Sequence, residues 1–497
     1  MYGKVYLVGV GPGDIKLLTI WALEVIKTCD VIVYDRLINQ EILKIAKEDA
    51  EFIDVGKFPG YHKVPQEHIN EIIVGKAKTG KSVARVKGGD PFVFGRGAEE
   101  AEYLKASGVS FEIIPGITSA VSVLTYAGIP VTHRNYSSSF QVISGYIRND
   151  NEDKIDWDAA AKYKGTLIFL MGAKNLGYIS NKLIKYGKDP KTPSAVIMHG
   201  TTFQQKVITG VLENIEKKAC DEIVNPAIIV FGDTVKLREK LKWFENRDLY
   251  GKRILITRSY KQSGYMKDTL NNAGAQVILC PTIKITPLID NVINFLKEIN
   301  NYEYIVFTST NSVEVFRQAV KKTKIDLRKL KSSIVAIGSQ TAKSLEDMYI
   351  YPEILPEKYT SYYLAKSLKD LVKDKYIALL TSQIGGNIFI QTLKEYANIK
   401  KIISYLNEPN YEIKEILRDE LKKGIDFAVF TSSSTFEYMY EIIREDIKLL
   451  RNTKIAAIGP ITAESIQKKG FKVDIMPNQY TTEDLVNEII KDIKNLN

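Results

Sequence analysis

Residues 87–100, KGGDPFVFGRGAEE, follow a short apolar strand at 82–86 and contain two adjacent glycines, a carboxylate directly after them and a charged pair further on. Because Gly88 and Gly89 carry no Cβ atom, their backbone can approach a ligand closely. Asp90 adds a carboxylate at the carboxyl end of the strand, where open α/β sheets bind ligands. Two charged side chains follow on the next turn and at the start of a helix: Arg96 and Glu99. The pattern predicts a ligand site, and the alternative is a glycine-rich connector that caps the helix.

Other apolar strands also end in residues that could do chemistry. The segment DVIVYDRL places Asp35 at the end of a buried strand, a position that suits a functional acid or base as well as it suits a surface ion pair. Thr118 and Ser119 of IIPGITSA lie near a helix start, where they could cap the helix, bind a ligand, or do both. Later strands end in methionine or glycine in the same way: Met171 of TLIFLMG, Gly200 of HGTT and Gly232 of NPAIIVFGD. Together these strand ends predict a cleft for a bulky ligand that is neutral or cationic.

The first strand leads into VGVGPGD, which comes close to the G-x-G-x-x-G pattern of dinucleotide-binding folds. Gly9, Gly11 and Gly13 give only G-x-G-x-G, and Asp14 stands where the third glycine of that pattern belongs. A carboxylate there would repel a pyrophosphate. This detail argues against NAD as the ligand.

The segment VGKFPGYHKVPQEHIN, at 55–70, is polar but carries aromatic residues between glycine and proline, which favours a lid or substrate loop. His62 and His68 lie six residues apart in it, and none of the four histidines has metal-ligand spacing. The three cysteines are far apart and odd in number, so neither a disulfide framework nor a zinc site is expected. No metal site is predicted, and a reducing cytoplasm is the default compartment.

Length and charge set limits on the class of protein. A chain of 497 residues exceeds what one core holds, so several domains are expected. No run approaches the roughly 18 apolar residues of a membrane span, and the start MYGKVYLVGV predicts a first strand rather than a signal peptide. The net charge is +10, but the lysines are dispersed and no nucleic-acid-binding motif is present. Dispersed lysine composition is therefore the favoured explanation, with a polyanionic substrate second.

Short apolar strands alternate with amphipathic helices along the whole chain, which predicts an α/β protein with mainly parallel strand pairing. The pattern breaks at a charged, helix-forming stretch over 236–252. We place the major boundary there. The expected division is a domain over 1–240, a linker over 241–251 and a second domain over 252–497.

The second half contains an internal repeat. YIVFTSTNS is answered by FAVFTSSST, and IVAIGSQTAKSL by IAAIGPITAESI. Phe307 and Phe430 are 123 residues apart, and Gly338 and Gly459 are 121 apart. Because the offsets agree within two residues, duplication of an α/β unit is the simplest account.

Such a duplication predicts two lobes with a cleft between them. The proline-bounded segments 280–287 and 403–410 are the expected crossings between the lobes. The lobes then have these ranges: one lobe 252–280 plus 410–497, the other 288–403. Serines crowd the strand ends of both lobes, among them Ser309 and Ser432. Hydroxyls and free N–H groups at helix starts bind carboxylates, so anion binding is expected in the cleft, with helix capping as the alternative.

Taken together, the motifs of the first half resemble a known family. GPGDIKLLT, YDRL, VGKFPGYHKVPQEHIN, VKGGDPFVFGRGAEE, PGITSA and AGIPVTHR are similar, in the same order, to the uroporphyrinogen-III C-methyltransferases among the tetrapyrrole methylases. That resemblance covers about residues 1–240, and about 252–497 resemble uroporphyrinogen-III synthase. The implied fold is a two-lobed tetrapyrrole methylase followed by a two-lobed α/β synthase with an internal repeat. The implied protein is a bifunctional, cytoplasmic enzyme of siroheme or cobalamin synthesis.

For the first half, the resemblance implies methylation of uroporphyrinogen III at positions 2 and 7 by two molecules of S-adenosylmethionine, giving precorrin-2. Asp35 matches the family's proton acceptor and Lys57 its proton donor. Arg96 and Glu99 match positions that hold the tetrapyrrole. The implied cofactor pocket consists of Pro12, Gly88, Gly89, Asp90, Val93, Thr118, Ser119, Met171, Gly200 and Ala227.

For the second half, the resemblance implies closure of hydroxymethylbilane to uroporphyrinogen III with inversion of ring D. Tyr405 of ISYLNE matches the tyrosine that assists departure of the hydroxyl group. The substrate carboxylates would be held by four residues: Ser309, Ser361, Ser432 and Thr462.

The chain departs from the family patterns at three places. Leu170 stands where a tyrosine usually precedes the methionine, and Phe58 replaces a frequent arginine, which removes one cation from the substrate mouth. In LLTSQIGGN, Ser382 and Gln383 occupy the place of a usual arginine.

Three alternatives remain for the function. The first half could be a later corrin-pathway methyltransferase, the second half could bind tetrapyrroles without catalysis, or the chain could bind nucleic acid. The resemblance itself implies small-molecule substrates, no nucleic acid and no membrane. It also implies a homodimer formed through the methyltransferase half, and a precorrin-2 dehydrogenase or chelatase on another chain.

Overall fold

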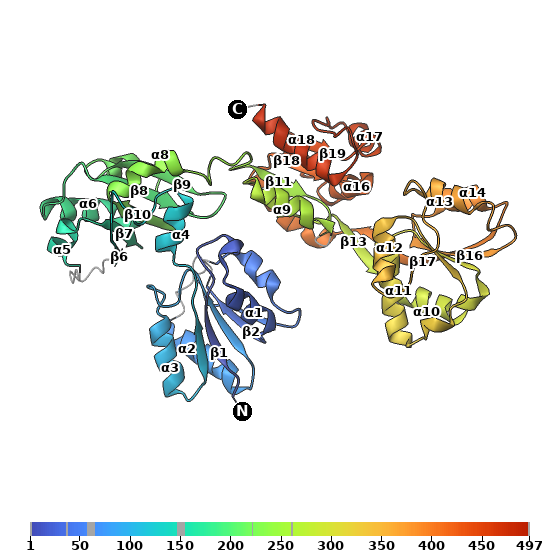
Figure 1. The fold of residues 1–497 in the computed structure, drawn as a ribbon, viewed down its shortest axis with the longest axis horizontal. Coiled ribbons are helices and arrows are strands. Elements are labelled where there is room, and N and C mark those ends of the chain that lie inside the picture. The colour runs from blue at the N-terminus through green and yellow to red at the C-terminus, as the bar shows by residue number, and fades with distance from the viewer. Residues whose placement is uncertain are drawn as a thin grey trace. The chain divides into compact units, whose positions relative to one another are not determined.

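The computed structural model describes residues 2–35, 38–56, 65–146, 155–220, 222–259 and 262–495. They form two compact units (Figure 1). The units are the following: unit 1, Met1–Gly251 with Ala273–Ala275, and unit 2, Lys252–Asn272 with Gln276–Asn497. The segment 241–251, which the sequence suggests as a linker, is thus part of unit 1. Its Phe244 and Leu249 are buried, and its half-exposed Trp243 ring lies 5.1 Å from that of Tyr126, so apolar and aromatic contacts hold the stretch on unit 1.

The first sheet of unit 1 has five parallel strands in the order β3-β2-β4-β1-β5. The strands are β1 Val5–Gly9, β2 Val31–Tyr34, β3 Glu51–Asp54, β4 Val83–Lys87 and β5 Phe111–Ile114. The helices beside them are α1 Ile20–Thr28, α2 Gln66–Lys78 and α3 Gly97–Ala106. Apolar side chains alternate along the strands, so that one set packs with α1 and the other with α2 and α3. The predicted parallel α/β layer is present here.

The second sheet of unit 1 has the order β6-β7-β10-β8-β9. Its strands are β6 Phe140–Ser144, β7 Thr166–Leu170, β8 Pro193–Met198, β9 Lys206–Val211 and β10 Ala227–Phe231. Its helices are α4 Ser119–Tyr126, α5 Trp157–Lys162, α6 Leu176–Lys185, α7 Ile215–Ala219 and α8 Arg238–Leu241. Only β6 and β7 pair in parallel; the other pairs are antiparallel. The expected mainly parallel pairing is wrong for this sheet, because β8 turns directly into β9 without a crossover helix.

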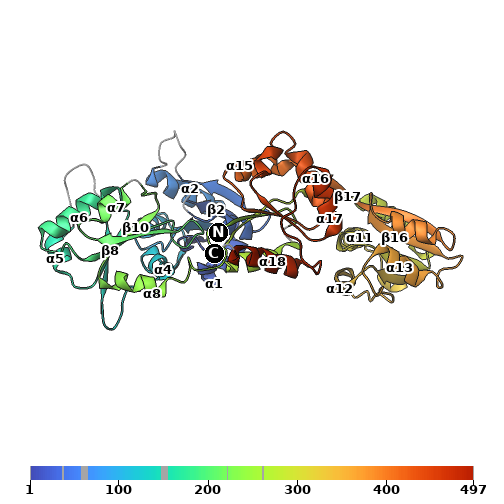
Figure 2. The ribbon, with the colours of Figure 1, turned by 90° about the horizontal axis from the view of Figure 1, so that it is seen from above.

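One sheet of unit 2 is parallel throughout, with the order β12-β11-β18-β19. Its strands are β11 Arg253–Ile256, β12 Gln276–Leu279, β18 Phe427–Phe430 and β19 Lys454–Ala457. Its helices are α9 Gly264–Asn272, α15 Lys414–Lys422, α16 Ser433–Ile442, α17 Pro460–Lys468 and α18 Thr482–Lys494. Figure 2 shows α15 and α18 on opposite faces of this sheet.

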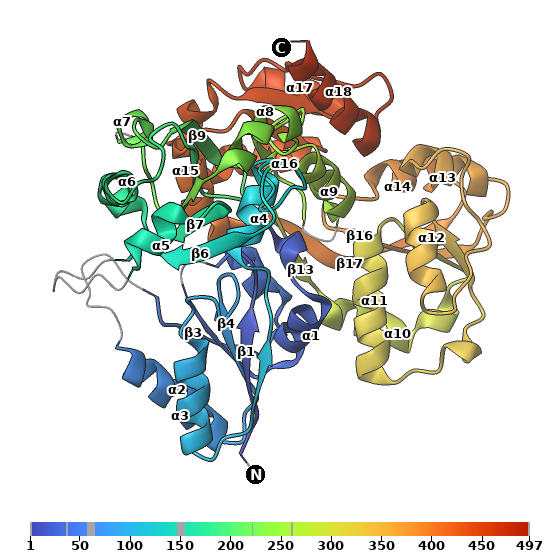
Figure 3. The ribbon, with the colours of Figure 1, turned by 60° about the vertical axis from the view of Figure 1, so that its left-hand side comes forward.

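The other sheet of unit 2 has the order β13-β17-β16-β14-β15. Its strands are β13 Ile283–Pro287, β14 Tyr304–Phe307, β15 Ser333–Ala336, β16 Tyr376–Ser382 and β17 Asn398–Pro409. Its helices are α10 Ile289–Lys297, α11 Thr310–Thr323, α12 Ser339–Glu346, α13 Ser361–Leu368 and α14 Asn387–Leu393. Helices α10 to α12 pack on one face, and α13 and α14 on the other (Figure 3). β13 and β17, which carry the two expected crossings, pair antiparallel with each other.

The predicted internal repeat is visible in the backbone of unit 2. A parallel bridge joins Val335 to Ile354 in one sheet, and an equivalent bridge joins Ala456 to Ile475 in the other, 121 residues later in each case. The helices that follow β14 and β18 start with nearly the same backbone angles, at Ser309 (φ −166°, ψ 158°) and at Ser432 (φ −164°, ψ 158°). Two copies of one α/β unit therefore build this half of the chain.

Candidate functional site

The carboxyl ends of the parallel strands in unit 1 meet at one edge of the first sheet, where ligands bind in open α/β folds. The loops after β1, β2, β4 and β5 leave from this edge. They carry most of the predicted site residues: Pro12, Asp35, Gly88, Gly89, Asp90, Thr118 and Ser119. The structure therefore brings together segments that are far apart in the sequence.

Glycines hold three of these loops against one another. Gly11 and Gly89 exchange two backbone hydrogen bonds, of 3.2 and 2.8 Å. A Cβ atom on Gly116 would lie 2.7 Å from the Cα atom of Gly9, so no side chain fits between the β1 and β5 loops. Gly88 differs, because it is exposed and a Cβ atom there would meet nothing closer than the Gly11 carbonyl oxygen at 4.0 Å. The loops thus form a tight backbone frame with open space beside Gly88.

Asp90 uses one carboxylate oxygen within its own loop and the other to reach the β5 loop. Its Oδ1 accepts a hydrogen bond of 2.8 Å from the Phe92 N–H, and its Oδ2 accepts one of 3.0 Å from the Gly116 N–H. Asp90 therefore ties the β4 loop to the β5 loop and shapes the edge.

Thr118 caps α4, as the alternative interpretation of its motif suggests. Its hydroxyl accepts a 3.3 Å hydrogen bond from the Ala120 N–H. Ser119 begins the helix, and its backbone nitrogen lies 3.9 Å from where a Cβ atom on Gly89 would be. The cap leaves the first turn of α4 facing the glycine loop.

The second sheet of unit 1 contributes the remaining predicted residues. β7 and β8 end, and β10 begins, at the same edge, since β10 runs antiparallel to both. Met171 directly follows β7 and is 50% exposed, whereas Ala227, the first residue of β10, is buried. Gly200 follows β8 and is packed so closely on α4 that a Cβ atom would lie 2.6 Å from Cγ2 of Val123.

Contacts at Asp14 connect the two edges within unit 1. The Asp14 N–H donates to Thr201 Oγ1 at 3.2 Å, and the Tyr126 hydroxyl donates to Asp14 Oδ2 at 3.0 Å. Burial, with the negative charge of Asp14, raises the pKa of Tyr126. Asp14, whose position argues against a dinucleotide, thus joins GPGD to the HGTT segment.

Backbone strain is concentrated in these motifs. Among the described residues, eight other than glycine have a positive φ, and five of them lie in segments assigned to the site. The five are Phe94, Arg96, Met171, His199 and Thr201. Such conformations cost roughly 1–3 kcal/mol each and collect at ligand sites, which supports a functional assignment of this region.

The residues predicted to act on the tetrapyrrole are partly placed. Lys57 lies outside the described residues. Asp35 is partly exposed, and its Oδ1 accepts a 2.7 Å hydrogen bond from Nη2 of Arg85. Arg96 and Glu99 are exposed and form a bidentate pair, at 3.0 and 2.6 Å, which lowers the pKa of Glu99. Val93, on the same loop, is exposed to a similar degree.

Sequence reasoning did not find a buried charged group behind this edge. Arg85 and Lys87 lie on β4, and Glu100 lies on α3; all three side chains are almost fully buried. The available signal was the strand VARVK, in which cations occupy alternate positions of an otherwise apolar strand.

In unit 2, Tyr405 lies on β17 and is only 6% exposed. Its hydroxyl is 3.0 Å from Oγ of Ser309, the residue that caps α11 by accepting from the Ser312 N–H. The phenol ring packs in the apolar core, so only its hydroxyl reaches the helix start. The structure thus joins two predicted residues that are 96 positions apart.

The other residues predicted to bind carboxylates differ in whether they cap a helix and in how deeply they are buried. Ser432 caps α16 by accepting from the Thr435 N–H, whereas at the start of α13 the cap is Thr360 and not its neighbour Ser361. Thr462 is only 4% exposed, so its side chain does not reach the surface. Of the four residues, Ser309 and Ser432 have the equivalent positions that the repeat predicts.

Gln383, which stands where the family usually has an arginine, is hydrogen-bonded to the backbone of β17. Gln383 donates from Nε2 to the Asn407 carbonyl at 2.8 Å and accepts at Oε1 from the Asn407 N–H at 2.9 Å. Arg258, a cation that the motifs did not indicate, lies two residues after the end of β11. It is half-buried, which lowers its pKa, and its Nε donates to Gln262 Oε1 at 3.0 Å. Its position after the first strand of unit 2 was the available signal.

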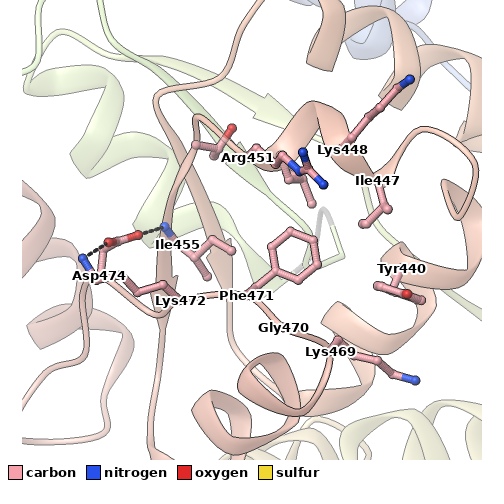
Figure 4. Close-up of a pocket in the computed structure, with 12 residues that line it drawn as sticks. Tyr440, Ile447, Lys448, Arg451, Ile455, Lys469, Gly470, Phe471, Lys472 and Asp474 are labelled. Carbon is pink, nitrogen blue, oxygen red and sulfur yellow. Dashed lines mark hydrogen bonds and ion pairs between the residues drawn. The ribbon is translucent and has the colours of Figure 1, made fainter.

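A cavity of about 410 Å³ opens elsewhere in unit 2, near the amino end of β19 (Figure 4). Its lining includes Tyr440, Arg451, Phe471 and several lysines. Figure 4 shows the Lys448 and Lys469 chains extending away from the hollow. The cavity contains none of the predicted site residues.

The described residues lack two further features. No group of three or more His, Cys, Asp or Glu side chains could hold a metal ion within that part of the chain. No helix in it is long and apolar enough to cross a bilayer.

Comparisons with known proteins match both halves. The family model "Tetrapyrrole (Corrin/Porphyrin) Methylases" matches residues 4–216, and "Uroporphyrinogen-III synthase HemD" matches 265–487. A porphyrin biosynthesis protein HemD of Ruminiclostridium josui is 36% identical over 99% of this chain and 98% of its own length. A uroporphyrinogen-III C-methyltransferase of Priestia megaterium is 52% identical over 47% of this chain and 98% of its own. A Thermus thermophilus uroporphyrin-III C-methyltransferase structure, complexed with S-adenosylhomocysteine, is 36% identical with a TM-score of 0.41, covering 47% of this chain and 99% of that one.

Proposed function

We propose a function for this chain, which belongs to the family of porphyrin-biosynthesis proteins in which a tetrapyrrole methylase is joined to a uroporphyrinogen-III synthase. The chain combines an S-adenosylmethionine-dependent uroporphyrinogen-III C-methyltransferase with a uroporphyrinogen-III synthase. Unit 2 closes hydroxymethylbilane with inversion of ring D, and unit 1 methylates the product at positions 2 and 7, giving precorrin-2. The observation that carries this proposal is the relative that matches 99% of the chain, across both halves.

The edge of unit 1 fits S-adenosylmethionine. When bound, this cofactor supplies an electrophilic methyl group, whose bonding electrons remain with the sulfur atom. The open position at Gly88 and the free start of α4 at Ser119 let the backbone approach such a ligand. Pro12, Gly89, Val93 and Thr118 border the same loops, and Asp90 keeps them in place. Met171, Gly200 and Ala227 would form the side of the pocket contributed by the second sheet.

Asp35 is the proposed proton acceptor. Methylation of a pyrrole carbon leaves the macrocycle with a positive charge, and loss of one proton restores neutrality. Oδ1 of Asp35 is bound to Arg85, whereas its Oδ2 has no hydrogen-bond partner among the described residues. Oδ2 is therefore the atom that would accept this proton. Lys57 is proposed as the donor.

Arg96 is the proposed ligand of a substrate carboxylate. The bidentate pair with Glu99 fixes the plane of the guanidinium, and both side chains are exposed, so a second carboxylate can reach it. Uroporphyrinogen III carries eight carboxylates, which a chain with a net charge of +10 also attracts.

Tyr405 is the proposed acid that assists departure of the bilane hydroxyl in unit 2. Its hydroxyl lies at the start of α11, where the helix dipole and free N–H groups favour negative charge. Ser309 and Ser432 are proposed to bind carboxylates with the helix starts that they cap. The same role is proposed for Ser361 and Thr462, which differ in that neither is a cap and Thr462 is buried.

We further propose a homodimer formed through unit 1. The product, precorrin-2, is still reduced and free of metal, so the proposed next partner is a dehydrogenase or chelatase on another chain.

Methylation of uroporphyrinogen III under anaerobic conditions tests the first activity. Mass spectrometry should show the gain of two methyl groups and two equivalents of S-adenosylhomocysteine. Methylation of supplied precorrin-2, but not of uroporphyrinogen III, would instead identify a later corrin-pathway methyltransferase.

A further inference from the structure

A buried cluster of charged and amide side chains lies behind the candidate methyl-transfer edge. We call it the Arg85 cluster; it consists of Asp35, Gln66, Arg85, Lys87 and Glu100. Arg85 is 2% exposed and Glu100 is 1% exposed, so both charges lie in the protein interior. Charged side chains this deeply buried are rare, and they require partners.

Glu100 is the centre of the cluster. Its Oε1 accepts three hydrogen bonds, from Arg85 Nε at 3.2 Å, Lys87 Nζ at 2.8 Å and Gln66 Nε2 at 3.0 Å. Its Oε2 is buried and has no partner among the described residues. One carboxylate from α3 therefore holds two cations of β4 and an amide of α2 through a single oxygen.

Arg85 connects the buried Glu100 to the partly exposed Asp35. With Nε on Glu100 and Nη1 on the Val86 carbonyl at 3.2 Å, the guanidinium plane is fixed. The remaining Nη2 donates to Asp35 Oδ1 at 2.7 Å. Asp35 follows β2, next to β4 in the sheet, and its side chain is 32% exposed.

The energetics argue against a role in stability alone. Burying ion pairs seldom stabilises a fold more than apolar side chains of the same size would. Burial, together with repulsion from Arg85, lowers the pKa of Lys87, which shows that the cluster carries an electrostatic cost. A fixed orientation of Asp35 is a benefit that apolar residues could not supply.

We propose that Arg85 and Glu100 are positioning residues for methyl transfer: Glu100 fixes Arg85, and Arg85 holds Oδ1 of Asp35 so that Oδ2 faces the substrate. The inference rests on the proposed role of Asp35 as proton acceptor. It adds two residues that do not touch the substrate and act through Asp35.

A double-mutant cycle on the full chain tests the inference. Arg85→Gln should lower the kcat of uroporphyrinogen III methylation by about 10–100-fold, as expected for a misplaced reacting group. Its KM and its affinity for S-adenosylhomocysteine should change by less than about threefold, because the effect lies in the chemical step. In an Asp35→Asn background, Arg85→Gln should cause no further loss, since the residue through which it acts is already impaired.

Two further variants distinguish a positioning role from a general effect on folding. Glu100→Gln keeps the size and one oxygen acceptor, and it should give a smaller loss of kcat that also disappears in the Asp35→Asn background. Lys188→Met removes another buried cation of unit 1, one that is bound to the Tyr163 carbonyl at 2.8 Å. This control should leave kcat unchanged and show no coupling to Asp35→Asn.

The outcomes separate the two claims. If the losses from Arg85→Gln and Asp35→Asn multiply in the double variant, Arg85 has a structural role and the inference is wrong. If Asp35→Asn alone retains the full kcat, the proposed role of Asp35 fails, and the inference fails with it.

Discussion

Replacing Gly116 by alanine tests the backbone frame on which the methyltransferase site depends. The new Cβ atom would overlap the Gly89 carbonyl oxygen, and it would lie 2.6 Å from the carbonyl carbon and 2.7 Å from the Cα atom of Gly9. Carbon atoms in contact are ordinarily about 3.5–4.0 Å apart, so the backbones would have to separate by about 1 Å. No side-chain rotation can relieve this contact, since its atoms are backbone atoms.

The expected cost follows from this overlap. Overpacking by one methyl group typically costs about 1–3 kcal/mol. For a unit of this size, a loss of about 2 kcal/mol lowers Tm by roughly 4–8 °C. Because the β1 and β5 loops move apart, affinity for S-adenosylhomocysteine should also fall.

A second glycine provides the matched control. Gly75 is exposed within α2, and nothing lies within 4 Å of an added Cβ atom. Gly75→Ala should therefore raise stability, by about 0.8–1 kcal/mol from helix propensity. The same substitution is thus expected to have opposite signs at the two positions.

Calorimetry of the full chain, with and without S-adenosylhomocysteine, measures both effects. The transition that the ligand shifts identifies unit 1, which matters because two units need not melt together. A Gly116→Ala protein that melts with the wild type and binds the ligand equally would refute the reasoning about the frame.

Four further predictions concern single residues. Asp90→Ala removes the acceptor that joins the β4 loop to the β5 loop and the one that holds the Phe92 N–H within the β4 loop, so it should abolish S-adenosylhomocysteine binding but not cyclisation; retained affinity in a titration would count against the assignment. Gly88→Ala should melt like the wild type, because its Cβ has room, yet bind S-adenosylhomocysteine more weakly; unchanged affinity would place the cofactor elsewhere. Tyr405→Phe should slow cyclisation and leave methylation unchanged, and an unchanged cyclisation rate would make the tyrosine structural. Burial lowers the pKa of His199, so the folded chain binds fewer protons than the unfolded chain near the ordinary value of 6.5, and stability should rise with pH through that range. His199→Asn, which suits the positive φ of 46°, should remove this pH dependence in calorimetry at several pH values; an unaltered slope would contradict it.

Periodicity and turn chemistry were sufficient to predict much of the fold. Apolar strands ending in glycine indicated the parallel sheet edge that gathers Gly89 and Asp90, and the sequence offset indicated the duplicated unit. The antiparallel second sheet of unit 1 could not be predicted in the same way, because a buried strand has the same composition in either direction.

Contacts between distant residues were the other limit. The bond from Arg85 to Asp35 joins positions 50 residues apart, and nothing in either motif specifies it. The burial of Phe244 and Leu249 within 241–251 also depends on a tertiary surface, since the charged residues around them suggest solvent.

The most direct test of the account supplies hydroxymethylbilane to the purified chain, anaerobically, with and without S-adenosylmethionine, and separates the products by isomer. Without the cofactor, we expect uroporphyrinogen III rather than isomer I, which forms spontaneously. With the cofactor, we expect a dimethylated product and two equivalents of S-adenosylhomocysteine. Formation of isomer I alone would contradict the synthase assignment and leave unit 2 as a binding module, and supplied uroporphyrinogen III that remained unmethylated would contradict the assignment of unit 1.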